Sequence, residues 1–266
     1  MLKTRPALLA TLAVTGLYAC AVSPTGQHQL KLFPDSQMAE MGVSAYAEMK
    51  QSTPASSDPV VSGYVNCVAN AITSALDSQT SWEVTVFEDE QVNAFALPGG
   101  KIGVYTGLLE VAENQDQLAT VIGHEVAHVL ADHGNARVSA TYATQAGLAL
   151  ATIIGVATID DPNKRQLLGL LGVGAQVGLL LPYGRSQETE ADIVGLDLMA
   201  KAGFDPRESV PLWQNMAAAG SGGTPEFLST HPSNERRIEN LSAEIPGAME
   251  LREKARAAGR RPDCRA

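Results

Sequence analysis

The segment TVIGHEVAHVLADH (120–133) carries two histidines four positions apart, His124 and His128, with Glu125 directly after the first. An α-helix turns by about 100° per residue, so residues four apart lie on one face, one turn above each other. Two imidazoles in this relation can bind one metal ion, and Glu125 lies close enough to contact a metal-bound water without binding the ion. This is the HExxH pattern of zinc hydrolases, in which zinc acidifies a water and the glutamate takes its proton.

The pattern stands in a predicted helix that begins with Asn114 or Asp116 as its N-cap and ends before Gly134. Apolar residues recur along this helix at helical spacing: Leu118, Val121, Ile122, Val126, Val129 and Leu130. Burial of these turns would hold the histidines against a core, where an unpaired imidazole is costly and a metal ion is a natural partner. The alternative is that both histidines are ordinary core or solvated residues with no metal.

A zinc site needs a third protein ligand, and the sequence offers two candidates. His133 follows His124 by nine positions, which is about 180° round the same helix, so its side chain should point away from the pair. Glu188 is the better candidate, because it stands in a second predicted helix, 187–202, that ends at Gly203.

Asp192 lies one turn after Glu188 on the same face of that second helix. It could accept the Nδ1 proton of a zinc-binding histidine and so fix the tautomer of the ring. The plainer reading is that Glu190 and Asp192 belong to an acidic, solvated turn near a helix N-terminus, where negative charge is favoured.

Four separate blocks of the sequence resemble one known family: 93–109, 118–133, 185–206 and 229–238. In residues and in order they are similar to the HtpX and type I CAAX prenyl protease family of zinc metallopeptidases, and most similar to its periplasmic lipoproteins of the LoiP and BepA type. The likeness extends from about Thr25 to Leu241. It implies an α+β fold, a mostly helical zincin (gluzincin) domain with a small β-sheet beside the HExxH helix.

The resemblance also implies the composition of the site. It places one Zn²⁺ per chain on His124, His128 and Glu188. It gives Glu125 the role of general base and Asp192 that of a partner behind a zinc ligand.

His231 stands on a proline-flanked loop, STHP (229–232), which predicts a side chain more exposed than that of a core histidine. The resemblance implies that His231 faces the metal-bound oxyanion, with Arg237 nearby, and stabilisation of that oxyanion is a large part of the rate in such enzymes. Two alternatives stay open. His231 could bind the zinc itself and block the water position, or it could only cap the loop.

The first segment, 1–19, is predicted to be a lipoprotein signal peptide. Lys3 and Arg5 precede a short apolar run, and a small residue stands before Cys20. The run is too short to span a bilayer as a helix. Cys20 would become a lipidated N-terminus anchored by several acyl chains, and Ala21 beside it fits sorting to the outer membrane of a Gram-negative bacterium. The alternative is an ordinary cleaved signal with a free Cys20.

The chain is acidic, with 19 Lys and Arg against 29 Asp and Glu and a formal net charge of −10. Loss of Lys3 and Arg5 with the signal gives 17 − 29 = −12. An acidic chain with no basic run argues against nucleic acid as a partner and leaves membrane contact to the anchor at Cys20.

Cys67 and Cys264 remain once Cys20 is lipidated. In an oxidising compartment they could form a disulfide that ties the C-terminal tail to an early helix. The alternative is a buried free Cys67 and a frayed end at Cys264.

The remaining elements are predicted from caps and periodicity. They are a strand near 29–33, helices at 36–49 and from Asp58, a strand at 82–87, a hairpin of 93–97 and 102–105 around a Pro-Gly-Gly-Lys turn, and a helix at 206–219. We divide the chain into the signal (1–19), an N-terminal anchor, strand and helix (20–57), a metallopeptidase domain (58–245) and a charged tail (246–266), expected to be a solvated helix or a fraying end.

Between the two ligand helices, apolar runs at 146–159 and 167–181 flank a charged segment. Each run is shorter than the roughly 20 residues that span a bilayer. We therefore favour a packed helical hairpin beside the cleft over insertion into the membrane.

Together these features favour a membrane-anchored zinc metalloendopeptidase that hydrolyses misfolded or misassembled envelope proteins, a substrate class that the resemblance alone implies. The competing reading is a zincin-shaped chaperone or assembly factor with a latent or structural zinc site. The presence of Glu125 favours the enzyme, because a structural site needs no base there. A third reading is a lipid-interacting protein that uses the apolar hairpin.

Overall fold

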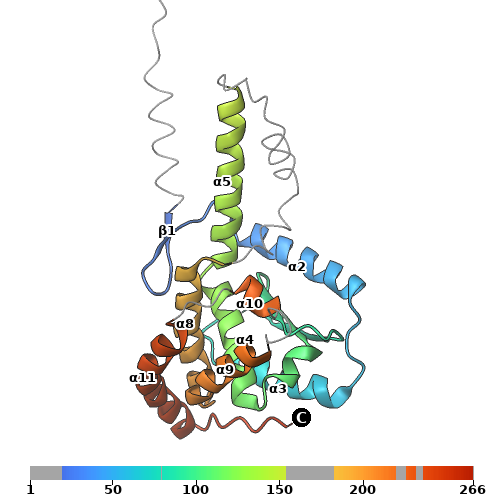
Figure 1. Cartoon of the computed structure of the whole chain (residues 1–266), viewed down its shortest axis with the longest axis vertical. Helices are drawn as coiled ribbons and strands as arrows, with labels where there is room; N and C mark the ends of the chain where they lie inside the picture. Colours follow the sequence, from blue (N-terminus) through green and yellow to red (C-terminus); the bar gives the residue numbers. More distant parts are fainter. Residues whose placement is uncertain (1–19, 79, 154–182, 220–225, 232–235, 266) are drawn as a thin grey trace, which may run out of the picture.

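The computed structural model describes residues 20–78, 80–153, 183–219, 226–231 and 236–265. Its elements are β1 (Cys20–Val22), β2 (His28–Leu30), α2 (Asp35–Ser52), α3 (Pro59–Thr73), β3 (Glu83–Phe87), β4 (Ala94–Leu97), β5 (Lys101–Tyr105), η1 (Thr106–Glu110), α4 (Gln115–Leu130), α5 (His133–Ile153), α8 (Arg185–Ala202), η2 (Pro206–Glu208), α9 (Ser209–Ala219), α10 (Glu226–Thr230) and α11 (Arg237–Ala257). Helices dominate, and a small sheet packs beside α4, so the expected mostly helical α+β fold is confirmed (Figure 1).

The sheet beside α4 has the strand order β3-β5-β4, with β3 parallel and β4 antiparallel to β5. β4 and β5 form the predicted hairpin, and Gly99 and Gly100 at its tip have φ of 84° and 71°. These angles lie in the left-handed region, which glycine enters without steric cost. Within the described residues β4 is an edge strand, and its backbone borders the HExxH helix.

The helix that carries HExxH begins as predicted, because the side chain of Asn114 accepts the backbone N–H groups of Asp116 and Gln117. Its predicted end is wrong. α4 stops at Leu130, and a second helix, α5, starts at His133, so that Gly134 lies inside α5. The chain turns at Asp132, whose φ of 56° is a conformation that aspartate tolerates better than most residues.

α4 and α8 cross with their backbones in close contact, at Gly123 and Gly195. A Cβ atom on Gly195 would lie 2.7 Å from the backbone nitrogen of His124, and one on Gly123 would lie 2.8 Å from the carbonyl oxygen of Gly195. Only glycine permits this approach on both sides. α8 ends as predicted at Gly203, which has a φ of 99°.

Gly195→Ala is therefore expected to separate the two helices. Overpacking of this kind costs about 1–3 kcal/mol of unfolding free energy, and it should also weaken metal binding, because both helices carry ligands. Gly63→Ala is the control, since a Cβ there meets nothing within 4 Å and a solvated helical site gains up to about 1 kcal/mol from Ala. Urea unfolding of both variants measures the effect, and equal stability of Gly195→Ala and wild type would contradict it.

The C-terminal part is a helix held to the rest of the chain. α11 runs through Pro246 to Ala257, and Ala248 and Ala255 are buried along it. Beyond it, Cys264 forms a disulfide with Cys67 of α3, with the two Cα atoms 5.7 Å apart. The predicted disulfide is confirmed, and the tail does not fray at this point.

The predicted apolar hairpin and signal peptide lie largely outside the described residues. α5 rises away from the other elements in Figure 1 and covers the beginning of the first apolar run, up to Ile153. Among the described helices, none is both long and apolar enough to cross a lipid bilayer.

Candidate metal centre

Four buried side chains bring one ligand atom each to a common point. His124 and His128 come from α4, Glu188 from α8 and His231 follows α10, and their ligand atoms all lie within 4.8 Å of one another. The two Nε2 atoms of the histidine pair are 3.1 Å apart. Glu188 reaches both rings, with Oε2 3.5 Å from Nε2 of His124 and Oε1 3.4 Å from Nε2 of His128.

The donor set fits a zinc ion. Burial lowers the pKa of His124, but the carboxylates of Asp192 and Glu188 outweigh it and raise that pKa to about 9, so this position favours positive charge. Nδ1 of His124 lies 3.0 Å from Oδ1 of Asp192. With its proton on that nitrogen, the ring presents the lone pair of Nε2 to Nε2 of His128. Two facing imidazole nitrogens and a carboxylate are ligands that Zn²⁺ accepts.

Glu125 lies between this cluster and β4. Its Oε2 accepts a hydrogen bond of 3.3 Å from the backbone N–H of Ala96, and its Oε1 lies 3.3 Å from Nε2 of His231. Burial raises the pKa of Glu125 to about 8. A carboxyl group whose pKa lies this close to neutral can both accept and release a proton during a reaction.

Arg237 lies behind the carboxylates of Glu188 and Asp192. Its Nη2 is 3.1 Å from Oε2 of Glu188 and 2.7 Å from Oδ1 of Asp192, and its guanidinium stacks 3.5 Å above the ring of Trp213. Although burial raises the pKa of Glu188, hydrogen bonds from His124 and His128 lower it well below its usual range. Glu188 is therefore ionised.

His231 is buried, with 3 % of its surface exposed, so the expectation of an exposed side chain is wrong. It packs against Phe227, whose ring centroid is 4.4 Å away, and its Nδ1 lies 3.2 Å from the carbonyl oxygen of that residue. Burial lowers the pKa of His231 to about 3. His231 is a member of the ligand cluster. Among the described residues its Nε2 makes no hydrogen bond, although Oε1 of Glu125 lies 3.3 Å away.

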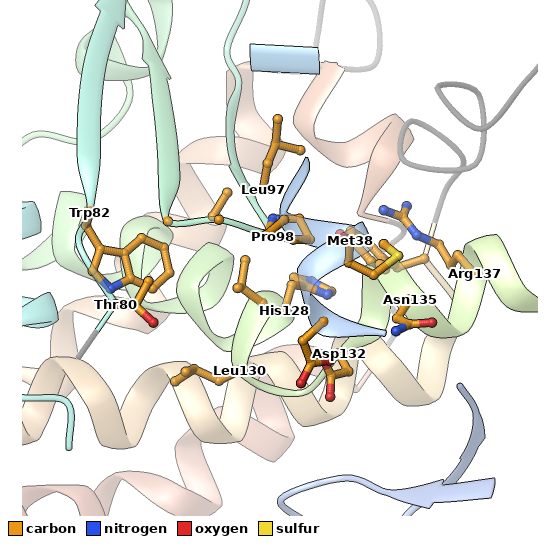
Figure 2. Close-up of a pocket in the computed structure, with 18 residues that line it drawn as sticks. Met38, Thr80, Trp82, Leu97, Pro98, His128, Leu130, Asp132, Asn135 and Arg137 are labelled. Atoms are coloured by element: carbon orange, nitrogen blue, oxygen red, sulfur yellow. The ribbon is translucent and has the colours of Figure 1, made fainter. Parts of the chain in front are cut away.

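Two cavities open beside the cluster, and Tyr183 and Arg137 line both of them. One of about 340 Å³ reaches His128, and Figure 2 shows this histidine with Arg137 on one side and Trp82 on the other. The second, of about 300 Å³, reaches Glu125 and His231. Tyr183 stacks on the ring of His128 at 3.7 Å, and the guanidinium of Arg137 lies 3.4 Å from the centroid of Tyr183.

The sequence of this chain matches that of a known protein family. The sequence profile of peptidase family M48 matches residues 60–245. The chain belongs to peptidase family M48. This confirms the family that the four blocks of sequence indicated.

M48 relatives occur in mitochondria and in bacteria. The chain is 40 % identical over 178 residues to "Mitochondrial metalloendopeptidase OMA1" of Schizosaccharomyces pombe, covering 66 % of this chain and 50 % of the relative. The corresponding Arabidopsis thaliana protein is 34 % identical over 232 residues, 85 % of this chain and 45 % of the relative. "Beta-barrel assembly-enhancing protease" of Yersinia pestis is 30 % identical over 216 residues, 77 % and 43 % of the two chains. This chain thus spans about half the length of these relatives.

Sequence reasoning missed two residues of this M48 site. His133 was placed on the same helix as His128 and pointing away, but the turn at Asp132 brings its Nδ1 to 2.9 Å from Nδ1 of His128. Glu190 was read as part of a solvated turn, but only 1 % of its surface is exposed and its Oε2 lies 3.2 Å from Nε2 of His133. The signal for His133 was present, since an aspartate that could end the helix stands directly before it.

Proposed function

We propose that this M48 chain is a zinc-dependent metalloendopeptidase. The observation that carries the proposal is the convergence of His124, His128 and Glu188 on one point, with the carboxylate of Glu125 beside it and facing a cavity. The family and the printed names of its relatives support the same activity.

Each side chain of the site has a separate role in this proposal. His124, His128 and Glu188 would hold Zn²⁺, which when bound would polarise a carbonyl and acidify a water. The carboxylate of Glu125 would take a proton from the attacking water and deliver it to the leaving amine. Asp192 holds the ring of His124 through Nδ1.

Arg237 balances the negative charge of two carboxylates in the site. Its guanidinium contacts both Glu188 and Asp192, so that the carboxylate of Glu188 would be fixed in place for binding the metal. This is a positioning role.

An extended peptide is the substrate form that the site suits. β4 is an edge strand of the described sheet, and the N–H of its Ala96 already points to Glu125. A peptide added beside β4 would present its carbonyl groups near the cluster. Unfolded or misassembled proteins offer such segments, and one relative is named for enhancing β-barrel assembly.

We place the protein at the periplasmic face of the outer membrane of a Gram-negative bacterium. The support is the predicted signal peptide, 1–19, and a lipid anchor at Cys20. The mitochondrial relatives do not support a location in a bacterial envelope. The proposed location therefore rests on the signal peptide and on Cys20.

The activity is tested by removing and restoring the metal. We expect the purified chain to carry one zinc and to cleave an unfolded protein such as reduced casein. Dialysis against a chelator should abolish cleavage, and one equivalent of Zn²⁺ should restore it. A chain that binds zinc but never cleaves would favour the competing function, a chaperone or assembly factor with a latent site.

His231→Ala tests what occupies the metal position that His124, His128 and Glu188 leave open. Because His231 is a member of the ligand cluster, we propose that it occupies the place of the attacking water in the resting chain. We therefore expect peptide cleavage by His231→Ala to rise, measured as kcat/KM on a fluorogenic peptide. A fall of about 100-fold would instead assign His231 to the oxyanion, and no change would leave it as a cap of its loop.

A further inference from the structure

The two histidines of the HExxH pattern are supported from α8 in different ways. His124 faces Asp192 directly, with Nδ1 and Oδ1 3.0 Å apart. Nδ1 of His128 faces another imidazole, that of His133, at 2.9 Å. His133 in turn has Nε2 3.2 Å from Oε2 of Glu190. All three members of this second series are at least 99 % buried, so their polar atoms face one another and not bulk solvent.

The protons in this series can be assigned from the chemistry of the rings. A neutral histidine that binds zinc through Nε2 carries its proton on Nδ1. His128 must then donate from Nδ1, and Nδ1 of His133 must accept. The proton of a neutral His133 therefore lies on Nε2, where Oε2 of Glu190 accepts it. Each N–H group in the series thus donates to an acceptor, in the direction from His128 through His133 to Glu190.

The far end of the series is held by the turn between β1 and β2. Oε1 of Glu190 accepts hydrogen bonds from the backbone N–H of Thr25, at 2.9 Å, and from its hydroxyl, at 2.7 Å. These residues are 165 positions apart, and Figure 1 shows the β1–β2 segment beside α8. Glu190 is thus fixed at both oxygens.

We propose that His133 and Glu190 are positioning residues for the zinc ligand His128, and that the turn at Thr25 completes the metal site by holding Glu190. The inference rests on the proposed function, because it requires His128 to bind zinc through Nε2. Its consequence is that a segment next to the proposed lipid anchor contributes to metal affinity. An outer partner of this kind is commonly worth 10- to 100-fold, as an order of magnitude.

NMR of the ring nitrogens in the zinc-loaded full chain, with isotope-labelled histidine, tests the proton assignment. We expect a neutral His133 protonated on Nε2 and a His128 protonated on Nδ1. A purely structural contact would not require this pair of tautomers. A His133 protonated on Nδ1, or on both nitrogens, would overturn the proposal.

Zinc affinity, measured by competition with a coloured chelator, tests the contribution of Glu190. Glu190→Gln is expected to weaken zinc binding by roughly 10- to 100-fold. Asp197→Asn is the matched control, because it removes a charge from the same helix at a half-exposed position paired only loosely with Lys201, at 3.9 Å. It should bind zinc like wild type. Equal affinity of Glu190→Gln and wild type would overturn the proposal.

Thr25→Val provides a milder variant that keeps the side-chain shape and the backbone N–H. It removes only the hydroxyl, so we expect a smaller loss of zinc affinity in the same direction, together with a changed visible spectrum of the Co²⁺-loaded chain. If Glu190→Gln does not fold, unchanged affinity and spectrum of Thr25→Val would refute the inference. If wild type binds zinc and cleaves, and these variants have the same zinc affinity as wild type, only this inference is refuted. If wild type binds no zinc, the proposed function is refuted as well.

Discussion

Glu125→Gln is expected to lower peptide cleavage by about 10²- to 10⁴-fold, the usual contribution of a general base, while one zinc stays bound. The amide has nearly the same shape as the carboxylate and can still accept the hydrogen bond from Ala96. It cannot take a proton from water. The measurement is kcat/KM on an unfolded protein or a fluorogenic peptide, with zinc content determined on the same sample.

Glu239→Gln is a suitable control for this variant, since Glu239 is an exposed residue of α11 outside the ligand cluster. It should cleave like wild type. Retained cleavage by Glu125→Gln would show that this carboxylate is not the base. Loss of zinc from Glu125→Gln would show that the cluster needs Glu125 as a ligand.

The disulfide is expected to have the largest effect on stability. It closes a loop of 197 residues between α3 and the tail beyond α11. Loop-closure entropy predicts that its removal lowers the free energy of unfolding by about 5 kcal/mol, an upper value because denatured chains retain structure. The double variant Cys67→Ser, Cys264→Ser, unfolded in urea, measures this difference without leaving a free thiol at either position.

A reductant provides the internal control. Wild type should lose stability when reduced, towards the value of the double variant, and the double variant itself should not respond. The end of the chain near Cys264 also contacts the start of α4, because its backbone N–H donates to Gln115 at 2.8 Å. A double variant as stable as oxidised wild type would contradict a role of the disulfide in holding this end.

Local patterns were sufficient to predict the parts of the site that lie within one helix. The spacing of His124 and His128 fixes their relative direction once the segment is helical, and the same holds for Glu188 and Asp192. The N-cap at Asn114 and the C-terminal glycine at Gly203 were likewise readable, because caps depend on neighbouring residues only.

Features that depend on contacts between distant segments could not be predicted from the sequence. His231 looked exposed beside a proline, yet it is buried against Phe227 within the cluster. His133 was misplaced because one residue, Asp132, turns the chain from α4 into α5. The bond from Thr25 to Glu190 joins residues 165 positions apart, and no periodicity of the sequence reports such a contact.

We propose that His124, His128 and Glu188 hold the zinc ion of a peptidase. The most direct test is a crystal structure of the zinc-loaded chain, with anomalous diffraction measured at the zinc absorption edge. We expect a single strong peak about 2.0–2.2 Å from Nε2 of both histidines and from a carboxylate oxygen of Glu188. A peak elsewhere, or a zinc ion bound without Glu188, would contradict it.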